Sequence, residues 1–303
     1  MTVETDNPPI EAASDADSVR LSCAQVRGGN TAVSESVDLP GARAVVFSRP
    51  AASGRGGDVH YVSVCGSGLI SRFCVADVVG HGQTVAAVSD ELHRVLRRLM
   101  NWLDHRFVLR RLNRVLERKG LDAVTTAAIA TYFPPSRTLS FSYAGHPPGW
   151  WYSSAEHRWR RLAMPSADDP DTKSFVNGAL AVIRDASFTR SRQKVEPGDR
   201  FLLVTDGILE TRDGEGQLFG SERVEAVLDR HRRDTVEDLS HSILDELERF
   251  SVDSGLAHDD VTFLLVEFTR PPGMFRQMMR NRLRRILNLF RRETGPAHAL
   301  REA

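Results

Sequence analysis

The order of apolar patterns along the chain constrains its fold most, because strand-like runs arrive in pairs and helical patterns do the same. Residues 59–65 and 69–75 are β-rich runs separated by Gly66-Ser67-Gly68, which predicts a hairpin. Helical patterns follow over residues 84–103 and, after a capping Asp104, as far as Gly120. This grouping favours an α+β domain with antiparallel sheets over repeated β-α-β units.

The second half of the chain continues the same grouping. The expected strands are residues 124–133, 138–143, 150–152, 201–204 and 261–268, and the expected helices are residues 224–231 and 236–250. The segment Pro134-Pro135-Ser136-Arg137 is rich in turn residues and joins the first two of these strands.

Charge, cysteine content and hydropathy exclude several classes of protein. The 303 residues carry 40 Lys+Arg and 40 Asp+Glu, so the net charge of zero gives no general reason to expect nucleic acid. The cysteines, Cys23, Cys65 and Cys74, are too few for a disulfide scaffold and indicate a reducing compartment. No run approaches the ~18 apolar residues of a membrane span, so a cytoplasmic location is expected.

The two ends of the chain differ in charge and divide it into three parts. Residues 1–40 are predicted to be an acidic, disordered tail, and residues 41–270 a single domain. Residues 271–303 form a basic tail in which 274–292 has the pattern of an amphipathic helix. That helix would pack on its own domain or a second subunit, or would contact an anionic membrane surface or an acidic partner.

Carboxylates stand at the ends of several predicted strands. Asp58 follows two glycines at the start of a strand, and Asp77 and Asp206 each follow an apolar strand. Asp259 and Asp260 directly precede the last strand. A single such Asp is most often a turn or cap residue. Several that meet at one edge would stay ionised with divalent cations, which prefer carboxylate oxygens.

An ordered set of motifs surrounds these carboxylates. The stretches are Gly56-Gly57-Asp58, Ala76-Asp77-Val78-Val79-Gly80-His81-Gly82, Tyr143-Ala144-Gly145-His146-Pro147-Pro148, residues 196–210, Leu218-Phe219-Gly220 and Asp259-Asp260-Val261-Thr262. Over roughly residues 42–268 the chain resembles the SpoIIE-like branch of the metal-dependent protein phosphatases, the superfamily of protein phosphatase type 2C.

The resemblance implies a four-layer α-β-β-α sandwich of two antiparallel sheets with a site for two divalent cations, Mn²⁺ or Mg²⁺. By position, Asp77 would bridge both metals, joined by the Val78 carbonyl. Asp206 and Asp259 would hold one metal. Asp58 would lie in the metal site or beside it, and Asp260 would support Asp259. Asp77 and Asp206 are thereby the expected catalytic residues.

The implied activity is hydrolysis of phosphoserine or phosphothreonine in a protein. Two metals ~3.5–4 Å apart lower the pKa of a bridging water and clamp the phosphoryl oxygens. The water attacks phosphorus in line, so the site needs carboxylates and no activated Cys or Ser. Family members often act on a phosphorylated anti-sigma-factor antagonist in bacterial partner switching, which is the expected kind of partner.

Two departures from the family pattern keep an alternative open. Tyr61 stands where the family usually has an acidic residue, and the family's Gly-x-Pro-Leu-Gly stretch is present only as Gly178-Ala179-Leu180-Ala181-Val182. The alternative is a catalytically weak or inactive metal-binding module that captures a phosphoprotein and regulates through its tail.

Histidines offer a second kind of candidate. His81 lies in the Asp77 loop as a general acid or, the favoured interpretation, as support for the Gly80–Gly82 turn. His146 is expected to be structural, and the role of His60 stays open. No substrate-binding residues are predicted.

Overall fold

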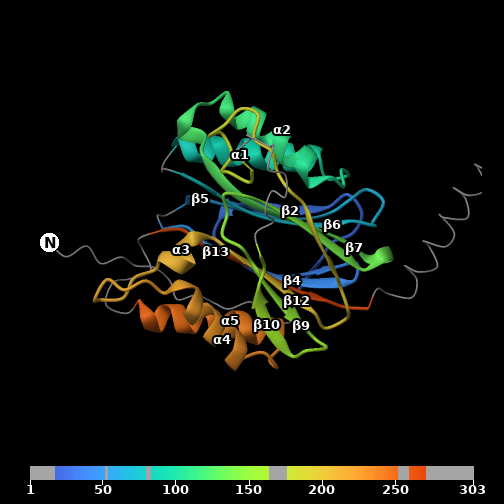
Figure 1. The fold of residues 1–303 in the computed structure, drawn as a ribbon, viewed down its shortest axis with the longest axis vertical. Helices are drawn as coiled ribbons and strands as arrows, with labels where there is room; N and C mark the ends of the chain where they lie inside the picture. Colours follow the sequence, from blue (N-terminus) through green and yellow to red (C-terminus); the bar gives the residue numbers. More distant parts are fainter. Residues whose placement is uncertain (1–17, 52–53, 80–82, 164–175, 252–258, 271–303) are drawn as a thin grey trace, which may run out of the picture.

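The molecule is a sandwich of two β-sheets with helices on both outer faces (Figure 1). The computed structural model describes residues 18–51, 54–79, 83–163, 176–251 and 259–270. The sheets pack face to face, and the helix pairs α1–α2 and α4–α5 form the two outer layers (Figure 1). The four-layer α+β architecture expected from the sequence is therefore present.

One sheet has seven strands and joins the start of the described chain to its end. In spatial order its strands are β1 (Val19–Arg20), β3 (Val33–Leu39), β4 (Ala42–Arg49), β13 (Val261–Phe268), β12 (Arg200–Val204), β9 (Trp150–Ser153) and β10 (Arg158–Arg161). Neighbouring strands are antiparallel except β1 and β3, which are parallel.

The other sheet has six strands, all antiparallel to their neighbours. Its order is β11 (Ser191–Lys194), β8 (Thr138–Ala144), β7 (Thr125–Phe133), β6 (Ser71–Val78), β5 (Arg55–Val64) and β2 (Val26–Thr31). The predicted hairpin joins β5 to β6, with Val64 opposite Ser71.

The helices cover the outer faces and begin at identifiable caps. They are α1 (Gln83–Arg98), α2 (His105–Glu117), α3 (Asp206–Glu210), α4 (Gly220–Arg230) and α5 (Val236–Phe250), with short 3₁₀ turns η2 (Leu121–Ala123) and η3 (Pro134–Ser136). The predicted Asp104 cap accepts a hydrogen bond from the Arg106 N–H at 3.1 Å. Thr235 caps α5 in the same way.

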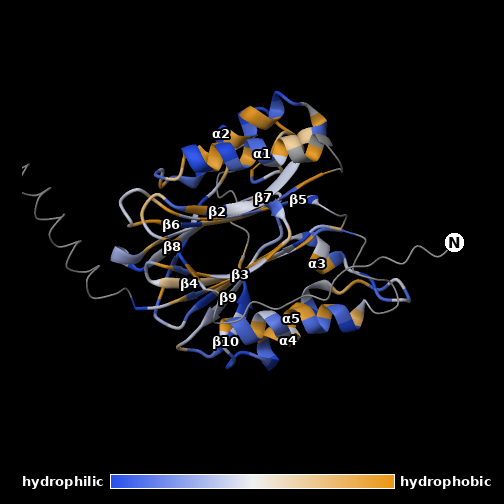
Figure 2. Cartoon of the chain, turned by 180° about the vertical axis from the view of Figure 1, so that it is seen from behind, coloured by the Kyte–Doolittle hydropathy of each residue, from blue (hydrophilic) through white to orange (hydrophobic). Residues whose placement is uncertain are grey.

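Alternation along the strands divides the apolar residues among three layers. Between the sheets lie large side chains such as Phe73, Trp151 and Phe268. The other strand faces pack against the helices, where Leu92 of α1 and Leu239 of α5 are buried. Figure 2 shows the matching mixture of hydrophobic and hydrophilic positions along the outer helices. This periodicity of two in strands and 3.6 in helices holds the four layers together.

The prediction that residues 1–40 form a disordered tail is wrong for residues 18–40. Strand β3 forms a full antiparallel pair with β4, and β2 adds to the edge of the six-stranded sheet beside β5. The physical reason is the alternation of Val33, Val37 and Leu39 with polar residues, which gives β3 one apolar face over the core. The domain therefore includes the edge strands β1 and β2 and the inner strand β3, all of which precede Ala42.

Other expectations fall outside the described part of the chain. Residues 1–17 and 271–303 are among these, so the amphipathic helix expected at 274–292 stays a prediction. Within the described ranges, no helix is long and apolar enough to cross a membrane. Cys65 and Cys74 are buried in the sheets, as expected of small apolar side chains.

Candidate active site

The strand order brings the predicted carboxylates to one end of the sandwich. In the six-stranded sheet, Asp58 of β5 lies directly opposite Asp77 of β6. In the seven-stranded sheet, β12 ends where β13 begins, so Asp206 and the pair Asp259-Asp260 emerge beside each other. Helix α3 starts at Asp206 at this end (Figure 1). Both sheets thus contribute acidic side chains to a single place.

Asp77 is the electrostatic centre of this cluster. Burial raises the pKa of its carboxyl group to about 7, and the nearby charges of Asp206, Asp259, Asp260 and Glu210 add to that rise. A carboxylate repelled by other carboxylates is costly to ionise unless a cation accompanies it. Asp77 therefore marks the point where a positive ligand would gain most.

Asp206 and Asp259 share this environment. Burial, followed by the charge of Glu210, raises the pKa of Asp206. Burial also raises the pKa of Asp259, against a hydrogen bond from the Asp260 N–H at 2.8 Å. Among the ion pairs of the described residues, none involves any of these carboxylates. Within the described residues, no positively charged side chain neutralises these carboxylates.

Asp58 lies deeper, between the two sheets, with only 3% of its surface exposed. The hydroxyl of Thr205 donates to its Oδ2 atom at 2.8 Å and lies beside Thr262, whose backbone N–H donates to Thr205 Oγ1 at 3.1 Å. Ser48 completes this chain of hydroxyls through a 2.8 Å hydrogen bond to Thr262. Burial and the charge of Asp77 raise the pKa of Asp58 well above its usual range. Asp58 thus forms the floor beneath the other carboxylates.

Asp260 has a different task, because its carboxylate is occupied by backbone donors. Its Oδ1 atom accepts from the Ala51 N–H at 2.7 Å, and its Oδ2 atom accepts from the N–H groups of Gly57 and Asp58. These bonds fix the entry to β5 against the start of β13. These contacts hold Asp260 beside β5, and its role as a support for Asp259 stays a prediction.

Glycines at two positions allow this close approach. A Cβ atom at Gly57 would lie 2.7 Å from the Val78 carbonyl oxygen and 3.4 Å from Asp77 Oδ1. A Cβ atom at Gly207 would lie 2.0 Å from the Asp260 carbonyl oxygen. Any side chain at either position would push the carboxylates apart, so these glycines are a condition of the cluster.

The donor set suits divalent cations in its chemistry. Asp77, Asp206, Asp259 and the Val78 carbonyl present oxygen ligands of the kind that Mg²⁺ and Mn²⁺ prefer. Their raised pKa values show that negative charge is unfavourable there, and a bound cation would stabilise the ionised carboxylates. Within the described ranges, however, no three His, Cys, Asp or Glu side chains already stand as a ready-made metal site.

Of the three candidate histidines, His60 and His146 are buried in the described structure and His81 is outside it. His81 lies outside the described residues, so both interpretations of it stay open. His146 is buried at the carboxylate end, where its Nδ1 atom bonds to Thr126 Oγ1 at 3.0 Å, and Thr126 pairs with Asp77 across β6 and β7. Burial lowers the pKa of His146 to about 4 and that of His60 to about 4. Both are therefore neutral at pH 7, while the structural role expected of His146 stays a prediction and the role of His60 stays open.

The two departures from the family pattern have clear positions. Tyr61 is fully buried under α1, with its hydroxyl donating to the Leu96 carbonyl at 3.3 Å, on the strand face opposite Asp58. Leu180 is buried and pairs with Thr125. The preceding residue, Val124, accepts a hydrogen bond from the Val79 N–H. The loop at 178–182 therefore borders the Val78–Val79 segment despite its altered sequence.

Sequence reasoning assigned no role to three polar side chains that the structure brings to the site. Glu210 lies one helical turn after Asp206 on α3, and the i, i+4 spacing is the signal that could have found it. Thr205 and Thr262 each stand within three residues of a site Asp in the sequence. Only the pairing of β12 with β13 shows that they share a hydrogen bond.

Comparison with known proteins places this geometry in a family. The family model described as Stage II sporulation protein E (SpoIIE) matches residues 71–269, which is more than half of the chain. The chain belongs to the SpoIIE family.

Individual relatives agree with this membership. The phosphoserine phosphatase RsbU of Bacillus subtilis (strain 168) is 26% identical over 198 residues, which are 64% of this SpoIIE-family chain and 55% of RsbU. The chain thus spans about half the length of the curated relative that it matches.

Solved structures confirm the fold expected for a SpoIIE-family member. The RsbU and RsbW domains of Rv1364c from Mycobacterium tuberculosis match with a TM-score of 0.64 and 24% identity, over 77% of this chain and 61% of that chain. RsbX in complex with magnesium matches with a TM-score of 0.57 and 14% identity, over 78% and 100% of the two chains. Both likenesses extend across the two sheets of the sandwich.

Proposed function

We propose that the chain is a metal-dependent protein serine/threonine phosphatase that hydrolyses phosphoserine or phosphothreonine in a partner protein. The observation that carries the proposal is the cluster of carboxylates at one end of a SpoIIE-family sandwich, where the pKa of Asp77 is about 7. The relative named a phosphoserine phosphatase supports the same activity.

In this function, Asp77, Asp206, Asp259 and the Val78 carbonyl would hold two divalent cations, Mn²⁺ or Mg²⁺. Bound cations of this kind supply Lewis acidity, which activates water and stabilises charge on phosphoryl oxygens. The neutral His146 stays in the floor.

The surrounding residues hold the carboxylates in place. Asp58 is bonded to Thr205, which ties the end of β12 to β5 across the two sheets. Asp260 fixes the Gly57 backbone, and Gly57 in turn leaves room beside the Val78 carbonyl. Such support lets the site keep its charges close before any substrate arrives.

The proposed substrate is a phosphorylated protein of the anti-sigma-factor-antagonist kind, within partner switching in bacteria. Three features support a protein substrate: the SpoIIE family, the name of the RsbU relative and the exposed Val79 directly after the site, with 54% of its surface accessible. A cytoplasmic location is part of this proposal, and contact with a membrane or acidic partner through residues 274–292 is its extension.

The test is Mn²⁺-dependent hydrolysis of p-nitrophenyl phosphate by the full chain, with and without a chelator. We expect turnover that the chelator and the Asp206→Asn substitution both abolish. Asp213→Asn is the matched control, since Asp213 only accepts hydrogen bonds from Glu215 and Gln217 in an exposed turn. Equal turnover by folded Asp206→Asn protein and wild type would refute the assignment.

A second candidate is the weak or inactive metal-binding regulatory module. The observation that favours it is Tyr61, which stands where the family usually has an acidic residue and is buried under α1 with its hydroxyl bonded to the Leu96 carbonyl. If Mn²⁺ binds with Asp77-dependent affinity but no phosphorylated protein or aryl phosphate is hydrolysed, this alternative replaces the enzyme.

A further inference from the structure

A second functional surface lies on the outer face of the six-stranded sheet, away from the carboxylates. It is a groove of about 470 Å³ between Leu103, which precedes α2, and the strands β7, β8 and β11. Cationic side chains line it (Arg190, Arg192 and Lys194) together with hydroxyls (Thr131, Ser136, Thr138 and Ser140). Among the described residues, no carboxylate lines the groove. We call this feature the basic groove.

Strand register explains why these side chains share one face. Arg192 pairs with Ser140, and Lys194 pairs with Thr138, between β11 and β8. Leu139 lies in the core between the sheets, so its neighbours Thr138 and Ser140 point the other way, toward the helix layer. Strand β11 ends the described order of this sheet, which leaves the groove at an edge.

Within the described ranges, no acid forms an ion pair with a cation of the basic groove, although the charge of nearby Asp104 acts on Arg190. Neither Arg190 nor Arg192 makes an ion pair or hydrogen bond within the described residues, and Lys194 donates only to the Ser136 carbonyl at 3.4 Å. The nearby Asp104 is committed to Arg106 at 3.0 Å. Burial and the charge of Arg192 lower the pKa of Arg190, which shows that like charges crowd there.

A buried arginine beneath the floor adds to this positive field. Arg72 has no exposed surface, and it donates to Thr131 Oγ1 at 3.3 Å and to the carbonyls of Leu99 and Trp102. Its partners are neutral, so its charge is not cancelled locally. In a low-dielectric surrounding such a charge acts over a longer range than one in water. The groove would therefore attract an anion strongly.

The spacing of the cations indicates which kind of anion fits the groove. Arg192 and Lys194 stand two positions apart on β11, so their backbone origins are about 6.6 Å apart along the strand, and Arg190 directly precedes that strand. A compact anion meets one or two of them, whereas an extended peptide with acidic residues at alternate positions repeats the same spacing. We propose that the basic groove docks an extended acidic segment of a partner protein. Trp102 and Leu103, each about half exposed beside the groove, would receive an apolar residue of that segment.

The test measures binding of a fluorescein-labelled Glu-Thr-Glu-Thr-Glu-Thr peptide to the full chain by fluorescence anisotropy at low salt. We expect saturable binding that Arg192→Glu weakens about tenfold or more, because a like charge then faces the peptide. Arg158→Glu is the matched control: Arg158 is exposed on the edge strand β10 of the other sheet and does not line the groove. The control should change affinity less than twofold.

Further measurements distinguish the proposed peptide from other ligands of the groove. A Glu-Glu-Glu-Thr-Thr-Thr peptide should bind more weakly, and inorganic phosphate should displace the alternating peptide only at far higher concentration. Equal binding of both peptides, displacement by phosphate at peptide concentrations, or equal losses in Arg192→Glu and Arg158→Glu would overturn the proposal. Tighter peptide binding after removal of residues 1–17 would assign the groove to the chain's own acidic segment instead. Thermal unfolding of each variant confirms that it is folded.

Discussion

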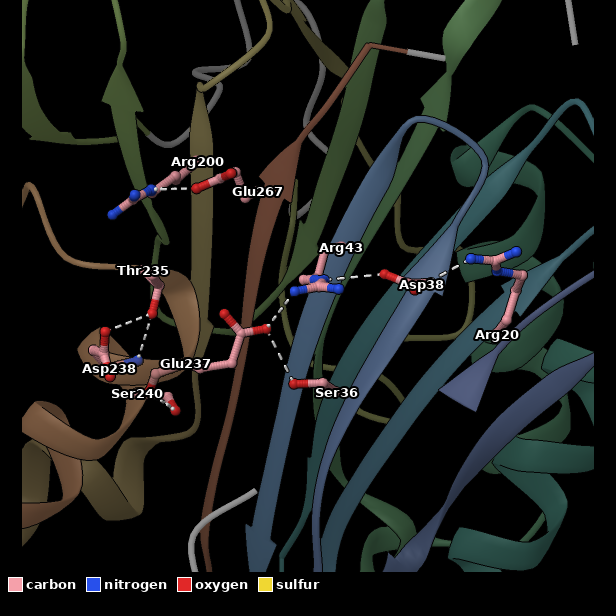
Figure 3. A network of polar contacts seen from close by, with 10 residues as sticks. All are labelled: Arg20, Ser36, Asp38, Arg43, Arg200, Thr235, Glu237, Asp238, Ser240 and Glu267. Carbon is pink, nitrogen blue, oxygen red and sulfur yellow. Dashed lines mark hydrogen bonds and ion pairs between the residues drawn. The ribbon is translucent and has the colours of Figure 1, made fainter. Parts of the chain in front are cut away.

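The two ends of the sandwich differ in whether their acidic side chains form ion pairs within the described chain. At the end opposite the carboxylate cluster, Arg43 lies between Asp38 at 3.0 Å and Glu237 at 3.3 Å (Figure 3). Arg200 pairs with Glu267 at 2.9 Å in the same region. These groups border a cavity of about 660 Å³ that both arginines and acids line. We call this region the paired end.

The difference shows which charges serve stability and which await a ligand. At the paired end each buried acid has a cation from the chain, so burial costs little beyond desolvation. At the carboxylate end the described chain provides no cation, and the pKa of Asp77 rises to about 7. Acids left unpaired in a folded protein are expected where binding occurs, because selection for stability alone would pair them.

The largest expected contrast is in activity. Asp77→Asn removes one negative charge from the centre of the cluster and should lower turnover of p-nitrophenyl phosphate at least about a thousandfold, or about 4 kcal/mol in the barrier. The same change at the paired end, Asp38→Asn, should leave turnover within about twofold because Asp38 forms ion pairs with Arg43 and Arg20 at the end opposite the cluster. Similar losses in both variants would remove the distinction between the two ends.

Stability should show the reverse contrast. Arg200 is almost buried, donates to Glu267 and to the Asp234 carbonyl at 2.7 Å, and lies over the Tyr152 ring. Arg200→Met leaves Glu267 without its cation, so the free energy of unfolding should fall by about 3 kcal/mol. Urea unfolding measures this change, and turnover of the remaining folded protein should not differ from wild type. A loss below about 0.5 kcal/mol would show that the paired end contributes little.

Much of this organisation could be predicted from the sequence. Periodicity identified both helix pairs and the strands β5 to β9, β12 and β13 because their apolar faces are long and regular, as in α5, whereas the inner strand β4 was not predicted. It failed for residues 18–40 because β2 carries Gly28 and Gly29 and sits at a sheet edge, where burial is partial. Edge strands give weak patterns because only one side of the strand packs on a neighbour.

For the candidate site, residue type was easier to predict than residue role. The motifs named Asp58 and Asp260 as candidate metal-site residues, but spacing could not separate a buried floor residue from a backbone clamp. That distinction depends on contacts between distant segments, such as Asp260 with Ala51. The basic groove was not predicted at all, since β11, β7 and Leu103 become neighbours only in the folded chain.

A third test uses the pH dependence of stability at His105, a buried group outside both ends. His105 is buried near the basic groove with its Nε2 atom 2.6 Å from Thr131 Oγ1, and burial lowers its pKa to about 3. In the unfolded chain a histidine gains its proton near pH 6.5, so the stability from neutral His105 is present above 6.5 and is lost as the pH falls. At pH 5 the loss is about 2 kcal/mol.

The variant His105→Gln isolates this contribution. The difference in free energy of unfolding between wild type and His105→Gln should shrink by about 2 kcal/mol between pH 7 and pH 5. Chemical denaturation at both pH values measures it. A difference that does not change with pH would mean that His105 is protonated in the folded protein as easily as in the unfolded chain.

The smallest expected effect is the change in stability that metal binding produces. A raised pKa at Asp77 means that the folded chain without metal loses stability as the pH rises from about 4 to about 7, since ionisation is costly there. At pH 8 without metal, Asp77→Asn should therefore be more stable than wild type. Mn²⁺ at ten times its dissociation constant should then raise the wild-type free energy of unfolding by about 1.4 kcal/mol and the variant's by less. Chelated and Mn²⁺-loaded thermal scans of both proteins test this, with Asp38→Asn as the control that should follow wild type. If Asp77→Asn is destabilised without metal, Asp77 has an unrecognised partner in the chain, and the unpaired carboxylate end is no longer the reason to expect a cation there.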